Sequence, residues 1–214
     1  LRTPLAGLRS TLEVALSRPR ESGEYRRAMD DCLGIARQMQ TMVGNLLDLA
    51  RLDVAARPGG TLRPVLLAEV LAECWKPLEP RAAQRHLRVA CSQANGLCVR
   101  ADPEQLKQVL GNLLDNAVSY ADQGGVVEAL VSEESARVAV VIRNTGSAVP
   151  AALAGRVFDR FWRGDAARRD TGLHCGLGLA LCRRLIEGLG GTIDARSEAG
   201  GWFEVRVELP AASP

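Results

Sequence analysis

Residues 102–121 read DPEQLKQVLGNLLDNAVSYA, and the interpretation of the whole chain starts from this stretch. Asp102 is a good helix cap and Pro103 suits the first helical position, so the stretch predicts one helix. Asn112 and Asn116 are four residues apart and project from one face of that helix, although helix interiors do not favour Asn. Such a pair of amide oxygens can hold Mg²⁺ together with phosphate oxygens. Alternatively, both amides cap a neighbouring loop or strand.

Three later stretches suggest related chemistry. CGLGLAL (175–181) places Gly176 and Gly178 where a helix begins, and the unpaired N–H groups there attract phosphate. RNTGSAVP (143–150) supplies a turn headed by a polar residue that can hydrogen-bond the edge of a base. VFDRFWRG (157–164) sets Arg160 and Arg163 beside two Phe, where they can clamp a loop and meet phosphate charge. Plain packing, or the end of a strand, is the competing interpretation of each stretch.

The sequence around these stretches alternates between helical and extended patterns. Helices interleaved with mostly hairpin-linked strands indicate an α/β sandwich, in which helices cover one sheet. Strands are expected within 86–92, 97–101, 125–134, 135–144 and 191–210, the last range holding a pair, and helices at about 66–83, 103–121 and 176–189.

The first quarter of the chain has a pattern typical of helices that pack on helices. Two helices, 1 to about 18 and a second one ending near Asp53, carry apolar residues in alternating steps of three and four. Seams this broad predict a two-chain four-helix bundle, unless they pack on the rest of the same chain. Pro4 is expected to kink a helix that already runs upstream. The seams are Leu1, Leu5, Leu8, Leu12 and Ala15, then Met29, Cys32, Ala36, Met39, Val43, Leu46 and Ala50.

The stretch DVAARPGGTLRP (53–64) contains the Pro and Gly residues of a linker. We therefore predict a helical domain at 1–55, a linker and hinge at 56–64, and an α/β domain at 65–214. The predicted fold class is α+β, a helical hairpin that forms a dimeric four-helix bundle, followed by an α/β sandwich.

Composition narrows the classes of function. Net charge is only +2, so nothing favours nucleic-acid binding, and no apolar run approaches the length of about 20 residues that a membrane span needs. The six cysteines form no CxxC pair, and most lie in apolar stretches, which predicts small core residues in a reducing compartment. A zinc site lacks the ligand spacing and the nearby histidines, because the chain has only His86 and His174.

The order and spacing of the four stretches resemble the transmitter region of bacterial sensor histidine kinases. They look like the N, G1, F and G2 boxes of that family, and LRTPL (1–5) looks like the tail of its H box. The glycine pattern and the N-T-G turn look most like the heavy-metal-responsive branch. The resemblance implies a dimerisation and histidine-phosphotransfer domain, followed by a Bergerat or GHKL-like ATP-binding domain. The phosphate-accepting His and a Glu would then occupy the two positions before Leu1.

The resemblance also implies roles for individual residues. Asn116 and Asn112 would hold Mg²⁺, Asn144 would meet the adenine amino group in place of the usual Asp, and Thr3 would take part in dephosphorylating the regulator. This sequence departs from the family pattern at three positions. Ser119 stands where relatives often have Lys or Arg near the phosphates, and Ala148 and His174 stand where they have Gly. The ATP-binding residues implied are Asn112, Asn116, Tyr120, Asn144, Gly146, Arg160, Arg163, Gly176, Leu177, Gly178 and Leu179.

These matches predict an ATP- and Mg²⁺-dependent protein-histidine kinase. It would pass the γ-phosphoryl group to a His, then to an Asp of a response-regulator receiver domain, and would dephosphorylate that regulator. We expect a homodimer that forms the cytoplasmic portion of an inner-membrane sensor, with anchor and sensor domain upstream of Leu1. Without the His, the fragment should not autophosphorylate. A dimeric nucleotide-binding scaffold without turnover is the alternative, and an anti-sigma-type kinase or ATPase is a third candidate that LRTPL and the heptad helices argue against.

Overall fold

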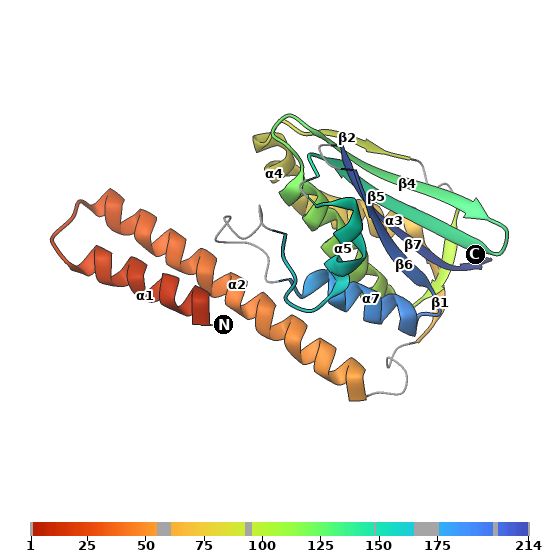
Figure 1. Ribbon diagram of the computed structural model, residues 1–214, viewed down its shortest axis with the longest axis horizontal. Helices are drawn as coiled ribbons and strands as arrows, with labels where there is room; N and C mark the ends of the chain where they lie inside the picture. Colours follow the sequence, from red (N-terminus) through yellow and green to blue (C-terminus); the bar gives the residue numbers. More distant parts are fainter. Residues whose placement is uncertain are drawn as a thin grey trace.

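The chain folds into a helical hairpin and a sheet covered by helices (Figure 1), which confirms the predicted hairpin followed by an α/β sandwich. Ala148, His174 and Cys175, which the sequence singled out, and linker residues 55–60 lie outside the described residues, as does Leu1. The computed structural model describes residues 2–54, 61–92, 96–147, 149–164, 176–198 and 201–213.

The hairpin consists of α1 (Arg2–Leu16) and α2 (Ser22–Val54), as the heptad pattern predicted. The two helices are antiparallel, and a Cβ at Gly7 would lie 3.9 Å from Ile35 Cδ1, which fixes their register. Pro4 lies in the first turn of α1, where the missing N–H removes no bond within the described helix.

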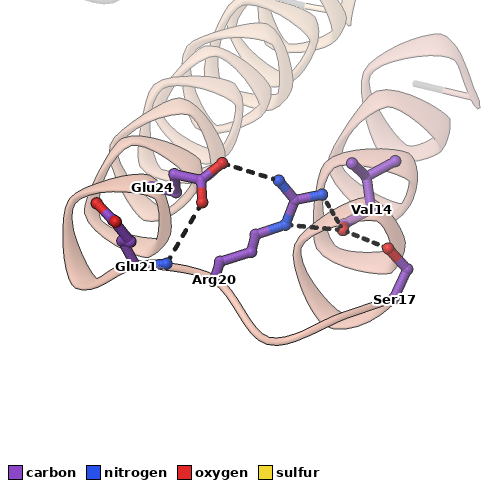
Figure 2. A network of polar contacts seen from close by, with 5 residues as sticks. All are labelled: Val14, Ser17, Arg20, Glu21 and Glu24. Atoms are coloured by element: carbon purple, nitrogen blue, oxygen red, sulfur yellow. Dashed lines mark hydrogen bonds and ion pairs between the residues drawn. The ribbon is translucent and has the colours of Figure 1, made fainter.

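A polar network closes the turn between α1 and α2 (Figure 2). Arg20 donates to the Val14 carbonyl from Nε at 3.2 Å and Nη2 at 2.9 Å, and pairs with Glu24 at 3.1 Å. Glu24 also accepts the Glu21 backbone N–H at 3.3 Å, which is half of a capping box at the start of α2. Because Val14 lies in the last turn of α1, this network satisfies groups at both helix ends.

The predicted seam stays largely uncovered in the single chain. Met29 is 67% exposed, Leu5 55% and Val43 43%. A different stripe of α2 is buried, since Met42 and Leu49 join the core of the sheet-containing part and Leu52 packs against it. Packing on the rest of the same chain, the alternative to a dimer, therefore accounts for Met42, Leu49 and Leu52 but not for the seam residues.

The described strands form one sheet in the order β1-β3-β7-β5-β4-β2. β7 pairs with β5 along one edge and with β6 and then β3 along the other. The pairing of β4 with β5 and of β6 with β7 confirms the two predicted strand pairs. β1 was not predicted. The strands are β1 (Arg63–Leu66), β2 (Arg88–Cys91), β3 (Cys98–Ala101), β4 (Val126–Glu134), β5 (Arg137–Thr145), β6 (Thr192–Ser197) and β7 (Trp202–Ala212).

Helices α3, α5 and α7 pack together beside the sheet (Figure 1). The side chains of β7 alternate between buried and half-buried, as expected when helices cover one face only. The helix predicted at 66–83 is broken into three pieces, because Pro77 and Pro80 have no backbone N–H to continue it. The helical elements are α3 (Leu67–Trp75), η1 (Lys76–Leu78), α4 (Glu79–Gln84), α5 (Pro103–Tyr120), η2 (Ala151–Phe158) and α7 (Gly178–Gly188).

The hydrophobic core lies between the sheet and these helices. Leu106, Leu110 and Leu181 are fully buried there. Among the described residues, no helix combines the length and apolar character needed to span a bilayer. Three of the cysteines, Cys74, Cys98 and Cys182, are buried as core residues.

Candidate functional site

A cavity of about 640 Å³ opens between α2 and the part of the chain that holds the sheet. The predicted stretches of α5, the β5 end, the 157–164 region and the start of α7 all contribute to its wall. Its lining residues are Gly34, Arg37, Gln38, Thr41 and Asn45 of α2, then Arg81, Arg85, Asn112, Asp115, Asn116, Ser119, Tyr120, Ala121, Asn144, Gly146, Ser147, Val149, Val157, Trp162, Arg163, Gly164, Gly176, Gly178, Leu179 and Phe203.

Helix α5 carries the two Asn residues to the cavity. Asp102 caps it as predicted, accepting the Gln105 N–H at 3.0 Å. Its apolar side is buried in the core, so the polar face that holds Asn112 and Asn116 turns to the cavity.

Asn112 also reaches the neighbouring helix. A Cβ at Gly178 would lie 3.6 Å from Asn112 Oδ1, which brings the amide against the first residue of α7. Burial raises the pKa of the Cys182 thiol to about 12, and a hydrogen bond with the Asn112 side chain opposes that rise. Asn112 therefore lines the cavity and also links α5 to α7, so the capping interpretation describes part of its role.

The end of β5 forms another wall. Asn144 is only 2% exposed, and its Nδ2 donates to the Thr145 carbonyl at 3.0 Å. Because Nδ2 is engaged in this way, the acceptor oxygen of the amide is left for another partner. Gly146 has a φ of 86°, and a Cβ there would lie 2.3 Å from the Asp122 carboxyl carbon, so this turn requires glycine.

The turn before α7 is held just as tightly. Gly176 has a φ of 71°, and a Cβ there would lie 2.6 Å from the Trp162 carbonyl oxygen. The Phe161 N–H donates to the Gly176 carbonyl at 2.8 Å. This contact fixes the 161–164 segment, including Arg163, beside the start of α7, whose first residues, Gly178 and Leu179, line the cavity. The first N–H groups of a helix have no partner within it.

Positive charge dominates the described wall. Four arginines line the cavity, Arg37, Arg81, Arg85 and Arg163, against one carboxylate, Asp115. Asp115 forms an ion pair with Arg81. The net charge of this lining favours an anionic ligand.

Three predicted site residues lie elsewhere. Arg160 Nη2 donates to both carboxylate oxygens of Asp53 at the end of α2, at 2.7 and 2.9 Å, and Arg160 does not line the cavity. Leu177 is fully buried in the core, and Thr3 is exposed on α1. The predicted residues in the wall are Asn112, Asn116, Tyr120, Asn144, Gly146, Arg163, Gly176, Gly178 and Leu179.

The sequence analysis predicted Arg163 but missed the other three arginines of the wall and the contribution of α2. Arg81 and Arg85 are four residues apart, which is a signal that two cations share one face of a helix. Arg37, Thr41 and Asn45 repeat the same spacing along α2, as a polar stripe beside the apolar seam. Without the tertiary structure, neither stripe indicates that its residues line this cavity.

Comparison with known protein families identifies both parts of the chain. Residues 101–213 match the family described as histidine kinase-, DNA gyrase B-, and HSP90-like ATPase. Residues 1–54 match the His Kinase A (phospho-acceptor) domain.

Individual relatives agree with this pairing. The chain is 32% identical over 200 residues to sensor protein IrlS of Burkholderia pseudomallei, covering 92% of this chain and 42% of IrlS. It is 33% identical over 213 residues to sensor protein CutS of Streptomyces coelicolor, covering 98% and 50%. The crystal structure of full-length ShkA in complex with AMPPNP superposes with a TM-score of 0.75 and 26% identity, covering 99% of this chain and 42% of ShkA. The chain thus spans half or less of the length of these proteins.

Proposed function

We propose that the cavity binds ATP with Mg²⁺, because this chain belongs to the histidine kinase-, DNA gyrase B-, and HSP90-like ATPase family. It also carries the domain pair of a sensor histidine kinase transmitter. The observation that carries the proposal is the convergence of all four stretches on one cationic cavity. The cationic wall and the first amides of α7 suit the triphosphate, while the Asn144 oxygen suits the amino group of adenine.

The donor atoms of the cavity fit Mg²⁺ when phosphate oxygens complete the ligand set. Asn116 and Asn112 offer neutral amide oxygens, and Asp115 is already paired with Arg81. Mg²⁺ prefers oxygen ligands and is commonly held by few protein groups plus phosphates. We assign Asn116 as the principal protein ligand, since Asn112 is shared with α7. When bound, the ion neutralises phosphate charge.

The hairpin would present the phosphate acceptor to this cavity. Gly7 of α1 faces Ile35 of α2, and the two helices are antiparallel. The position two before Leu1 lies eight residues upstream of Gly7. If α1 continues upstream, that position is therefore level with Val43, which lies eight residues after Ile35. Val43 lies between Thr41 and Asn45, which line the cavity. A His at that position would meet the γ-phosphoryl group at the interface of the two domains. Catalysis would then consist mainly of positioning and charge neutralisation.

In the whole protein, we propose phosphoryl transfer from that His to an Asp of a response-regulator receiver domain. Thr3 would serve a separate reaction, in which water hydrolyses the phospho-Asp of that regulator and releases inorganic phosphate. The uncovered seam residues of α1 and α2, such as Leu5, Met29 and Val43, support a homodimer with a four-helix bundle. A membrane anchor and sensor domain upstream would place this chain on the cytoplasmic side, in a sensor that we assign to the heavy-metal-responsive branch.

A nucleotide-binding scaffold without turnover is the second candidate, because Ser119, Asn144 and His174 depart from the family pattern in the sequence. Both candidates predict ATP binding, and only the kinase predicts labelling of a supplied His-bearing helical hairpin by γ-labelled ATP. Absence of such labelling, with ATP binding intact, favours the scaffold.

Isothermal titration calorimetry tests the site itself. The unmutated chain should bind ATP in the presence of Mg²⁺, and Asn116→Ala should remove the Mg²⁺-dependent part of the affinity without unfolding the chain. Gln84→Ala is the matched control, since Gln84 is an exposed amide on α4 outside the cavity wall. Unchanged affinity in Asn116→Ala would refute the assignment of the ligand.

A further inference from the structure

Arg85 is a part of the cavity wall that the family pattern did not predict. It follows α4, and its guanidinium covers the end of α5. Nη1 donates to the Val118 carbonyl at 3.0 Å and to the Ser119 carbonyl, and Nη2 donates to the Ala121 carbonyl at 2.5 Å. The cation is therefore fixed in place by backbone contacts before a ligand arrives.

The charge of Arg85 is not neutralised within the described part of the chain, where no carboxylate forms an ion pair with it. Its neighbour Arg81 differs, because Asp115 pairs with it. The three bonds of Arg85 go to carbonyls at the C-terminal end of α5, whose dipole carries only about half a negative charge, so part of the positive charge remains. A guanidinium has five N–H donors, so hydrogen-bonding capacity remains as well.

The residue beneath Arg85 explains how the guanidinium fits. Ser119 is short, and its Oγ is buried without a hydrogen-bond partner among the described residues. A long side chain at this position would compete with Arg85 for the same part of the wall, which Asn116 and Tyr120 flank.

We propose that Arg85 recognises the phosphates of the bound nucleotide and supplies the positive charge that position 119 lacks; the inference rests on the proposed function of the cavity. An arginine held rigidly suits phosphate oxygens, because less side-chain freedom is lost when the hydrogen bonds form. The cation also offsets the negative end of the α5 dipole, which would otherwise repel phosphate.

Calorimetry with ATP, ADP and adenosine, each in the presence of Mg²⁺, separates this role from a structural one. Arg85→Gln should weaken ATP binding about tenfold or more, as expected for loss of a charge-assisted hydrogen bond. Adenosine has no phosphate, so its affinity should change little. Arg88→Gln is the matched control, because Arg88 is an exposed arginine of β2 outside the cavity wall. An equal loss for adenosine and ATP would mean that Arg85 only supports the fold, and would overturn the proposal.

Ser119→Lys provides the second arm. In the Arg85→Gln background it should recover most of the lost ATP affinity. In the unmutated background it should add little or nothing, since the charge is already present and the lysine competes with Arg85 for the same part of the wall. Equal effects in both backgrounds would overturn the replacement of one cation by the other. Failure of the unmutated chain to bind ATP would overturn the proposed function, while ATP binding that Arg85→Gln leaves unchanged overturns only the role of Arg85.

Discussion

Replacing Gly176 with Ala should destabilise the fold and weaken ATP binding together. A residue with a Cβ loses about 1–2 kcal/mol in the left-handed conformation that Gly176 adopts, with its φ of 71°. The new methyl would also lie 2.6 Å from the Trp162 oxygen and 2.8 Å from the Phe161 carbonyl carbon, which are backbone atoms. Overpacking of this kind costs about 1–3 kcal/mol, so the expected total is about 2–5 kcal/mol.

Urea unfolding followed by circular dichroism measures this loss. With a slope of about 2 kcal/mol per molar, the transition midpoint should fall by about 1–2.5 M. Gly178→Ala is the matched control two residues away, because its Cβ would meet only Asn112 Oδ1 at an ordinary 3.6 Å. That variant should keep its midpoint or gain up to about 1 kcal/mol of helix propensity. A Gly176→Ala midpoint equal to that of the unmutated chain, or an equal loss in Gly178→Ala, would refute the reasoning.

Three further predictions concern the rest of the chain. Asp53→Ala removes the contacts with Arg160 and Arg184 and should lower the free energy of unfolding in urea by less than about 1 kcal/mol, since the Asp53 side chain is 39% exposed. The difference should shrink in about 0.5 M salt, and an effect independent of salt would contradict an ion pair. Val43→Asp should convert a dimer to a monomer in light scattering, because a charge buried in the seam costs several kcal/mol. The exposed control Gln40→Asp should stay dimeric. A dimeric Val43→Asp would contradict the seam as the dimer interface. Cys182, with a pKa of about 12 caused mainly by burial, should resist alkylation at pH 8 until the chain unfolds, and mass spectrometry showing equal rates in both states would refute its burial.

The fold was largely predictable because its elements are defined by local patterns. The seam steps in α1 and α2 and the cap of α5 each mark an element within a few residues of its observed bounds. The short β1 was missed, since its four residues contain Pro64 and gain their place only by pairing with β3. Its existence depends on a partner more than thirty residues away, which no local pattern encodes.

The candidate site was predictable where one motif holds both the side chain and its geometry. Asn112 and Asn116 share a helix face, and Gly146 and Gly176 occupy turns whose positive φ requires glycine. Arg160 was expected among the ATP-binding residues, but its position is decided by Asp53, more than one hundred residues earlier in the chain.

Three of the four arginines of the wall, Arg37, Arg81 and Arg85, were missed for the same physical reason. Arg37 and Arg85 reach the cavity only because the tertiary structure brings α2 and the end of α4 to the same cavity as α5. On the sequence, each is one exposed cation among the many arginines of the chain.

The central claim is that this cavity delivers the γ-phosphoryl group of ATP to a histidine on α1, and direct labelling tests it. The chain as it stands and a chain extended upstream through His-Glu and two further helical turns are incubated with Mg²⁺ and γ-labelled ATP under identical conditions. Only the extended chain should acquire acid-labile, base-stable label, because proximity of the imidazole supplies much of the rate. Equal labelling of both chains, or label that maps to His86 or His174, would contradict the account.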